Sequence, residues 1–168
     1  MKQLLQICLL SLLGFGLAGC ASYKLGAVKD PGFKTIFIEN FKSQVDEPGL
    51  ENLVTTTVIK EFQNDGTLRV VSMEQADVIL RGKITAFETT PLRYSRQNEL
   101  TPTEAGMSIE VTYTLTKKGQ EKPYQEAKVT GATTFFIGND LQGDKRQGVP
   151  LASEKLGREL LKMLVEGW

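Results

Sequence analysis

Ten consecutive residues, 107–116, alternate strictly between apolar and polar side chains. The apolar members are Met107, Ile109, Val111, Tyr113 and Leu115, and Ser108, Glu110, Thr112, Thr114 and Thr116 stand between them. Successive side chains of a strand point to opposite faces of its sheet. The segment is therefore predicted to be a strand with one face on a core and the other toward water or a polar neighbour.

Four other segments have the β-branched and aromatic composition of strands, namely 34–41, 68–71, 76–87 and 127–137. One face of the third is predominantly apolar and consists of Val78, Leu80, Gly82, Ile84 and Ala86. A turn-prone stretch at 117–123 predicts a hairpin between the alternating strand and the last strand.

Two segments have apolar residues at helical spacing. The first stripe consists of Leu50, Leu53, Val54, Val58, Ile59 and Phe62, and Gly66 is placed to cap this helix in the left-handed conformation. The threonines at 55–57 are interpreted as a mostly solvated or half-buried face. Pro150 is predicted to open the second helix, whose stripe consists of Ala152, Leu156, Leu160, Leu161, Leu164 and Val165.

Both stripes need an apolar partner, and the sheet offers one on a single face. We therefore predict an α+β fold, a two-layer sandwich with two helices packed on one face of a four- or five-stranded, mostly antiparallel sheet. An amphipathic membrane helix is the alternative interpretation of the last helix, and a core-facing helix is preferred.

The N-terminus has the features of an export signal. A lysine at position 2 precedes an apolar run over 4–15, and small residues at 16–19 lead to Cys20. The run is shorter than the ~20 residues that cross a bilayer. Residues 17–20 (LAGC) resemble the lipobox of bacterial lipoproteins, which implies lipidation of Cys20. In the sorting rule that this resembles, Ala21 favours the outer membrane.

These features predict a signal peptide at 1–19, a lipidated tether at 20–33 and a single domain at 34–168. Two or more acyl chains would hold the domain firmly on the membrane. Cys8 leaves with the signal and Cys20 is consumed by lipid, so the mature chain has no cysteine pair for a disulfide.

Composition also limits the function. The chain contains no histidine, which excludes the Ser-His-Asp and Cys-His nucleophilic sites and the usual zinc ligand sets. Without Lys2 the mature chain has 19 basic and 20 acidic side chains, a net charge of −1 that argues against a nucleic-acid binder. No metal, cofactor or catalytic residue is predicted.

Residues 88–106 are predicted to form a long irregular loop, a kind of segment that is usually functional or mobile. The loop carries Arg93 and Arg96, and the far end of the following strand carries Lys117 and Lys118. Either pair is a candidate to bind phosphate, although ordinary solvated charge also explains both. A straight strand at 107–116 would hold the pairs about 30 Å apart, too far to form one site.

Four further stretches carry a family resemblance: 36–41 (IFIENF), 49–51 (GLE), 66–71 (GTLRVV) and 75–84 (QADVILRGKI). Together with the lipobox they resemble the lipopolysaccharide-assembly lipoprotein family, LptE, over most of the mature chain, more weakly after about residue 117. The resemblance implies two helices against a four-stranded sheet and no enzymatic activity. It also implies a plug and assembly partner inside a large outer-membrane β-barrel, LptD, with possible contact to lipopolysaccharide.

Two alternatives remain open from the sequence. The first is an auxiliary binding lipoprotein of another envelope transport or secretion system. The second is an envelope hydrolase that uses carboxylates such as Asp77 and Glu110. Asp77 is more simply a turn residue before a strand, and Glu110 an exposed strand position.

Overall fold

The alternating segment is the middle of a longer central strand. In the computed structural model, which describes residues 31–97, 101–138 and 140–166, this strand is β5 (Pro102–Lys117). It pairs antiparallel with β4 (Val78–Tyr94) on one side and β6 (Gln125–Phe136) on the other. The predicted signal peptide, Cys20 and most of the tether lie outside the described residues.

Three short strands complete the sheet beside β4. They are β1 (Thr35–Ile38), β2 (Lys42–Ser43) and β3 (Arg69–Val70), and the strand order is β3-β1-β4-β5-β6, with β2 also paired to β4. All three strands pair in parallel with a neighbour, so the sheet is mixed. It has six strands, whereas the sequence predicted four or five. The reason is α2 (Leu50–Asp65), a crossover helix that returns the chain so that β3 runs parallel to β1.

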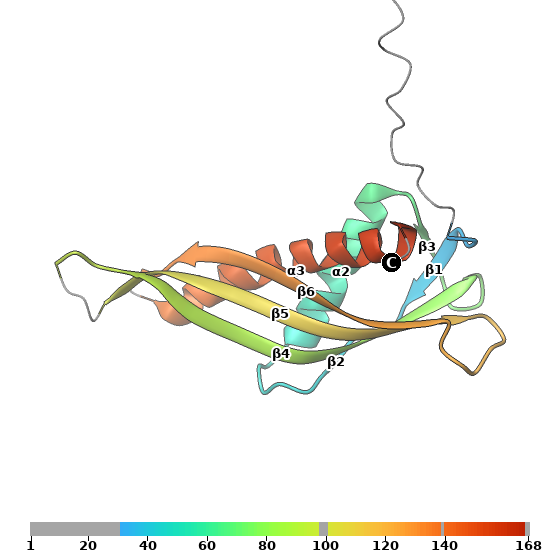
Figure 1. Cartoon of the computed structure of the whole chain (residues 1–168), viewed down its shortest axis with the longest axis horizontal. Coiled ribbons are helices and arrows are strands. Elements are labelled where there is room, and N and C mark those ends of the chain that lie inside the picture. Colours follow the sequence, from blue (N-terminus) through green and yellow to red (C-terminus); the bar gives the residue numbers. More distant parts are fainter. Residues whose placement is uncertain (1–30, 98–100, 139, 167–168) are drawn as a thin grey trace, which may run out of the picture.

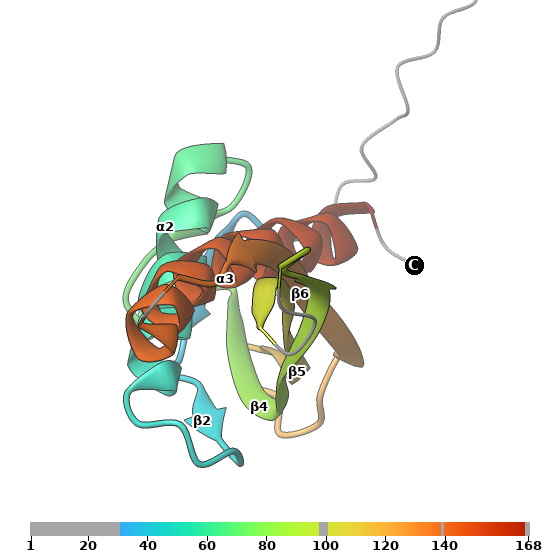
Figure 2. The same ribbon diagram turned by 90° about the vertical axis from the view of Figure 1, so that its left-hand side faces the viewer.

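Both helices cover the same face of the sheet, which confirms the two-layer α+β prediction (Figures 1 and 2). The long α3 (Leu141–Glu166) packs on β6 and β5, and α2 packs beside it against β3 and β2. No helix among the described residues is long and apolar enough to cross a membrane. Ala152, Leu156, Leu160 and Leu164 of α3 are buried in the core, so the last helix faces the core, as predicted.

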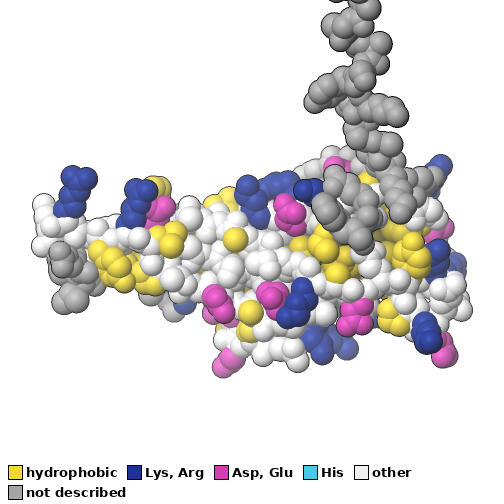
Figure 3. Space-filling view, viewed as in Figure 1, with side chains coloured by type: hydrophobic (Ala, Val, Ile, Leu, Met, Phe, Trp, Pro, Cys, Tyr) yellow, Lys and Arg dark blue, Asp and Glu magenta, His cyan; other side chains and the backbone are white. Residues whose placement is uncertain are grey.

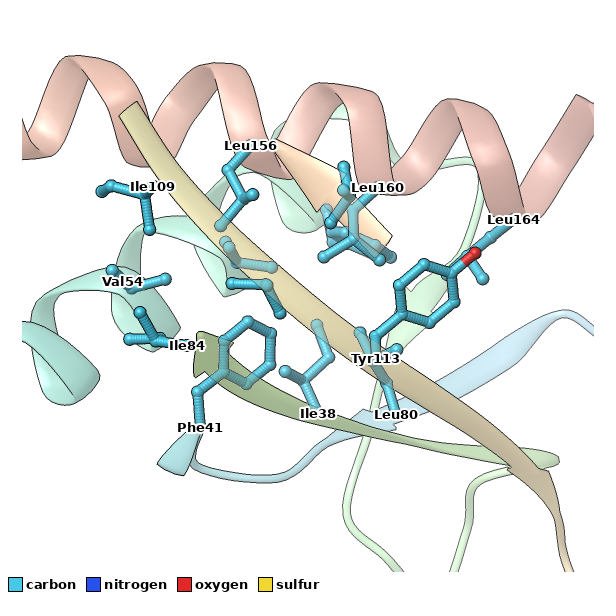
Figure 4. Close-up of a cluster of buried hydrophobic side chains, with 14 of the residues drawn as sticks. Ile38, Phe41, Val54, Leu80, Ile84, Ile109, Tyr113, Leu156, Leu160 and Leu164 are labelled. Atoms are coloured by element: carbon cyan, nitrogen blue, oxygen red, sulfur yellow. The ribbon is translucent and has the colours of Figure 1, made fainter. Parts of the chain in front are cut away.

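Side chains from the two layers meet in one continuous core. Figure 4 shows six fully buried members of this core: Val54, Ile84, Ile109, Tyr113, Leu156 and Leu160. Burial of such a side chain contributes about 1.5–3 kcal/mol. Phe33, at the end of the predicted tether, is also buried in this core.

The threonine run in α2 departs from its interpretation at one position. Thr55 is buried, whereas Leu53, which was assigned to the apolar stripe, is 37% exposed. The Thr55 hydroxyl accepts a hydrogen bond from the Phe41 N–H at 2.9 Å and donates to the Glu51 carbonyl at 2.6 Å. Thr55 thereby satisfies a backbone donor in the segment between β1 and β2. The predicted Gly66 cap is confirmed, with φ 75° and an N–H donated to the Phe62 carbonyl.

The predicted loop at 88–106 is wrong for most of its length. Residues up to Tyr94 extend β4, and β5 begins at Pro102, so the segment is mainly the outer part of a hairpin. The register shifts between Ile84 and Ala86 and again between Pro91 and Arg93. A bulge moves the following side chains to the other face, so Ala86 pairs with Glu110 on the polar side rather than joining the apolar face.

The last helix also begins earlier than predicted. Its first residue is Leu141, so Pro150 lies inside α3 instead of opening it. Proline removes one helical hydrogen bond, and packing compensates for that loss here. Gly148 and Val149 are buried, and a Cβ on Gly148 would lie only 3.0 Å from Cε of Met107.

Two glycines allow α3 to approach its neighbours closely. A Cβ on Gly131 of β6 would lie 2.2 Å from the Ala152 carbonyl oxygen and 2.5 Å from the Leu156 nitrogen. A Cβ on Gly157 of α3 would lie 3.0 Å from Cβ of Glu61 in α2. The backbone of α3 thus rests almost directly on β6, and only glycine fits at that contact.

We expect Gly131→Ala to lower the free energy of unfolding by about 2–3 kcal/mol, because the methyl group overlaps helix backbone that must move away. The measurement is chemical denaturation of the purified protein. Gly106→Ala in β5 is the matched control, since its Cβ would meet only a Leu92 methyl at 3.4 Å. Equal stability of the two variants would contradict the close contact between α3 and β6.

Candidate functional site

The face of the sheet that the helices leave uncovered is polar. The exposed or half-exposed side chains on it are Arg81, Lys83, Glu88 and Thr90 of β4, Ser108, Glu110, Thr112 and Thr114 of β5, and Glu126, Lys128, Thr130 and Thr134 of β6. We call this surface the open face. The alternation in the sequence predicted it directly for β5.

Ion pairs order part of the open face. Arg81 Nε lies 2.7 Å from Glu39 Oε2, and Lys128 Nζ lies 2.9 Å from Glu110 Oε1. Glu110 also accepts a hydrogen bond from the Thr85 hydroxyl at 2.8 Å. Hydrogen bonds from Lys128 and Thr85 lower the pKa of Glu110, so this carboxylate is held in its charged form.

The far end of the β4–β5 hairpin combines exposed apolar and basic side chains, as Figure 3 shows at its left-hand end. Leu92 and Tyr94 are each 52% exposed, and Phe136 of β6 is 81% exposed. Arg93 and Phe136 both pair in register with Glu104. We call Leu92, Tyr94 and Phe136, together with Arg93 and Arg96, the distal patch.

The two arginines of the distal patch differ in their pairing. Arg93 Nε lies 3.0 Å from Glu104 Oε2, although 78% of the arginine side chain stays exposed. Arg96 is exposed and has no ion pair with any residue that the structure describes. The sequence pointed to both arginines as candidates but did not place Leu92 and Phe136 beside them. The available signal for Phe136 was the alternation in 127–137, which puts this residue on the polar face of its strand.

Lys117 and Lys118 lie at the opposite end of the hairpin. Lys117 pairs in register with Val78, and its Nζ lies 4.3 Å from the centre of the Tyr124 ring. Lys118 donates a hydrogen bond from its Nζ to the Glu74 carbonyl. Glu104 and Lys117 are 13 residues apart on β5, which corresponds to about 43 Å. As predicted, the arginine pair and the lysine pair cannot form one site.

The two carboxylates of the hydrolase alternative are also far apart. Asp77 directly precedes Val78 at one end of β4, whereas Glu110 pairs with Ala86 farther along the strand. Asp77 accepts hydrogen bonds from the N–H groups of Lys34 and Thr35 at 3.0 and 2.9 Å. A catalytic acid needs a raised pKa, whereas the pKa of each of these two carboxylates is lowered. The choice of Asp77 and Glu110 as a catalytic pair was therefore wrong. Within the described part of the chain, no group of three potential ligand residues could hold a metal ion.

Comparison with known proteins decides the family. The family model for LptE, lipopolysaccharide-assembly, matches residues 33–166. The chain belongs to the LptE family. The match extends across both helices and the whole sheet, including the part after residue 117 where the sequence resemblance was weaker.

Solved structures share the fold of this LptE-family protein at low sequence identity. A protein from Xanthomonas campestris is 13% identical with a TM-score of 0.57, and the alignment covers 83% of this chain and 91% of that one. A hypothetical protein from Chlamydia trachomatis is 11% identical with a TM-score of 0.55, covering 81% and 97%. PelC from Paraburkholderia phytofirmans, crystallised as a dodecamer, is 16% identical with a TM-score of 0.51, covering 85% and 94%. Among curated proteins, no sequence matches significantly.

In this LptE-family chain, Asp77 joins β1 to the start of β4, and its role gives a pH-dependent prediction. The Thr35 hydroxyl and the backbone N–H groups of Lys34 and Thr35 lower its pKa from the ordinary value of 3.8. A lowered folded pKa means that the stabilisation is fully present above 3.8 and is lost as the pH falls through the folded pKa.

We therefore expect Asp77→Asn to unfold at a lower temperature than the wild type at pH 7, with the difference shrinking as the pH falls below 3.8. Thermal unfolding across this pH range measures the effect. Asp46→Asn, at an exposed carboxylate, is the control and should follow the wild type throughout. A constant difference at every pH would contradict the role of the charge.

Proposed function

We propose that this protein is an outer-membrane lipoprotein, anchored through an acylated Cys20, that acts as plug and assembly partner of a large LptD-like β-barrel in lipopolysaccharide assembly. The observation that carries the proposal is the match to the LptE family over the whole described domain. The function is binding rather than catalysis, in keeping with a chain that contains no histidine. The partners are the barrel, lipopolysaccharide and the membrane through the lipid anchor.

The open face suits the barrel contact. The interiors of outer-membrane barrels are polar, and a plug must present polar side chains to such a wall. The threonines of β5 and β6 and the ion pairs of Arg81 and Lys128 provide donors and acceptors over an extended surface. The helix-covered face cannot serve in this way, since its side chains form the core.

The distal patch suits a lipopolysaccharide contact. Lipopolysaccharide combines acyl chains with anionic groups, and the patch places exposed Leu92, Tyr94 and Phe136 next to two arginines. A guanidinium forms paired hydrogen bonds with phosphate oxygens, and Arg96 is unpaired among the described residues. Lys117 and Lys118 are the weaker candidates, because the Tyr124 ring and the Glu74 carbonyl already engage them.

The barrel assignment predicts a specific copurification. Affinity purification of the tagged, full-length protein from detergent-solubilised membranes should recover one large β-barrel protein in near-stoichiometric amount. Mass spectrometry identifies the barrel. Recovery of subunits from a different transporter or secretion pore would instead support the auxiliary-lipoprotein alternative and overturn the plug assignment.

The distal patch predicts that Arg93→Gln with Arg96→Gln weakens binding of purified lipopolysaccharide by about tenfold, because two charge-assisted hydrogen bonds are lost. Binding is measured with the lipidated protein in detergent. Lys117→Gln with Lys118→Gln removes the same charge at the other end and should have a smaller effect. If the lysine variant loses more affinity than the arginine variant, the contact lies at the opposite end of the hairpin.

A further inference from the structure

A hollow of about 310 Å³ lies on the open face at the edge where β2 meets β4. Its lining combines donor side chains with two carboxylates: Asn40, Lys42, Arg81, Lys83, Thr112 and Thr114, together with Glu39 and Glu126. The volume is at the lower end of the range for ligand pockets, about 300–1,000 Å³. The hollow therefore suits a small polar group rather than a lipid chain.

Lysine side chains form a row across this part of the sheet. Lys42 of β2 pairs in register with Lys83 of β4, Lys83 with Thr112 of β5, and Thr112 with Lys128 of β6. Neighbouring like charges on adjacent strands destabilise a sheet unless an opposite charge compensates them. Lys128 has Glu110 as its partner at 2.9 Å, whereas Lys42 and Lys83 have no ion pair with any described residue.

The carboxylates around the hollow leave the charge of these two lysines uncompensated. Glu39 is neutralised by Arg81 at 2.7 Å. Glu126 belongs to β6, which lies three strands and about 14 Å from Lys42 of β2, and two strands and about 10 Å from Lys83 of β4. Glu126 is thus placed to accept hydrogen bonds from hydroxyl groups at the far side of a ligand whose anionic end lies between Lys42 and Lys83.

We infer that this hollow is a binding site for a phosphorylated sugar. The ammonium groups of Lys42 and Lys83 receive the phosphoryl group. The hydroxyls of Thr112 and Thr114 and the carboxylate of Glu126 bind the sugar hydroxyls across β5 and β6. The site has a cationic pole at one edge and hydroxyl groups with a carboxylate at the other, which matches a monosaccharide phosphate, either free or as part of a glycolipid headgroup.

This site is separate from the distal patch. Thr112 and Glu104 are eight residues apart on β5, which corresponds to about 26 Å. The site shares Thr112 and Thr114 with the open face, so a barrel wall packed on that face would cover it, and the binding test below uses the protein without the barrel. The inference rests neither on the barrel assignment nor on Arg93 and Arg96, and it goes beyond the proposed function. If no barrel copurifies, or if the arginine variant binds lipopolysaccharide like the wild type, the inference about this hollow is unaffected.

Calorimetric titration of the full lipidated protein in detergent tests the site, with glucose 1-phosphate, inorganic phosphate and glucose as probes. We expect glucose 1-phosphate to bind with a Kd of about 1 mM or tighter, inorganic phosphate to bind more weakly and glucose to give no saturable binding. The double variant Lys42→Gln with Lys83→Gln should weaken the binding of glucose 1-phosphate by about tenfold or more. Lys60→Gln with Lys122→Gln, which removes the same charge from exposed positions elsewhere, should bind like the wild type.

A second variant separates sugar recognition from simple anion binding. The double variant Thr112→Val with Thr114→Val keeps the shape of both side chains. It should weaken the binding of glucose 1-phosphate about threefold and leave the binding of inorganic phosphate unchanged. Competition by detergent-dispersed lipopolysaccharide would identify a glycolipid as the source of the sugar phosphate, and its absence a soluble one. The inference is overturned if the lysine variant binds both anions like the wild type, or if phosphate and glucose 1-phosphate bind equally in every variant.

Discussion

The contact between α3 and β6 is the interaction on which the rest of the structure depends. At Gly131 the helix backbone comes so close to the strand that no side chain fits between them, and Leu156 and Leu160 are buried beneath the helix. This contact fixes which face of the sheet is covered. It also brings Gly157 against α2, so one helix positions the second. Without it, the apolar side of β5 would be exposed to water.

Covering one face leaves the other free for recognition. A sheet between two helical layers would have no exposed face, and a sheet closed into a barrel would have no accessible edge. Here three long antiparallel strands present a mainly polar surface, and the hairpin of β4 and β5 extends beyond the helices and carries most of the distal patch. The same architecture therefore supplies an extended surface for a protein partner, an amphiphilic end and a small hollow beside β2.

Much of the fold was predictable, because the spacing of apolar residues along the chain reflects which side chains are buried. Strict alternation is typical of a half-buried strand, and it identified β5 and its polar face. The apolar stripes identified both helices and their core-facing side. The hairpin end of the sheet was missed because Pro91, Pro102 and many polar residues resemble a loop in sequence, although antiparallel pairing satisfies their backbone. The early start of α3 was missed because Gly148 and Pro150 disfavour a helix that packing on Met107 stabilises.

The sequence by itself determined the layers, the family and the two groups of basic residues, since each follows from local pattern or from residue identity. Only the tertiary structure decided which side chains share a surface. Bulges near Thr85 and Leu92 reverse the faces of the following residues, and a parallel pairing brings Lys42 next to Lys83 from 41 positions away in the chain. A hairpin turn can fix the register of neighbouring antiparallel strands, but no turn joins β2 to β4, so their pairing is decided only when the chain packs.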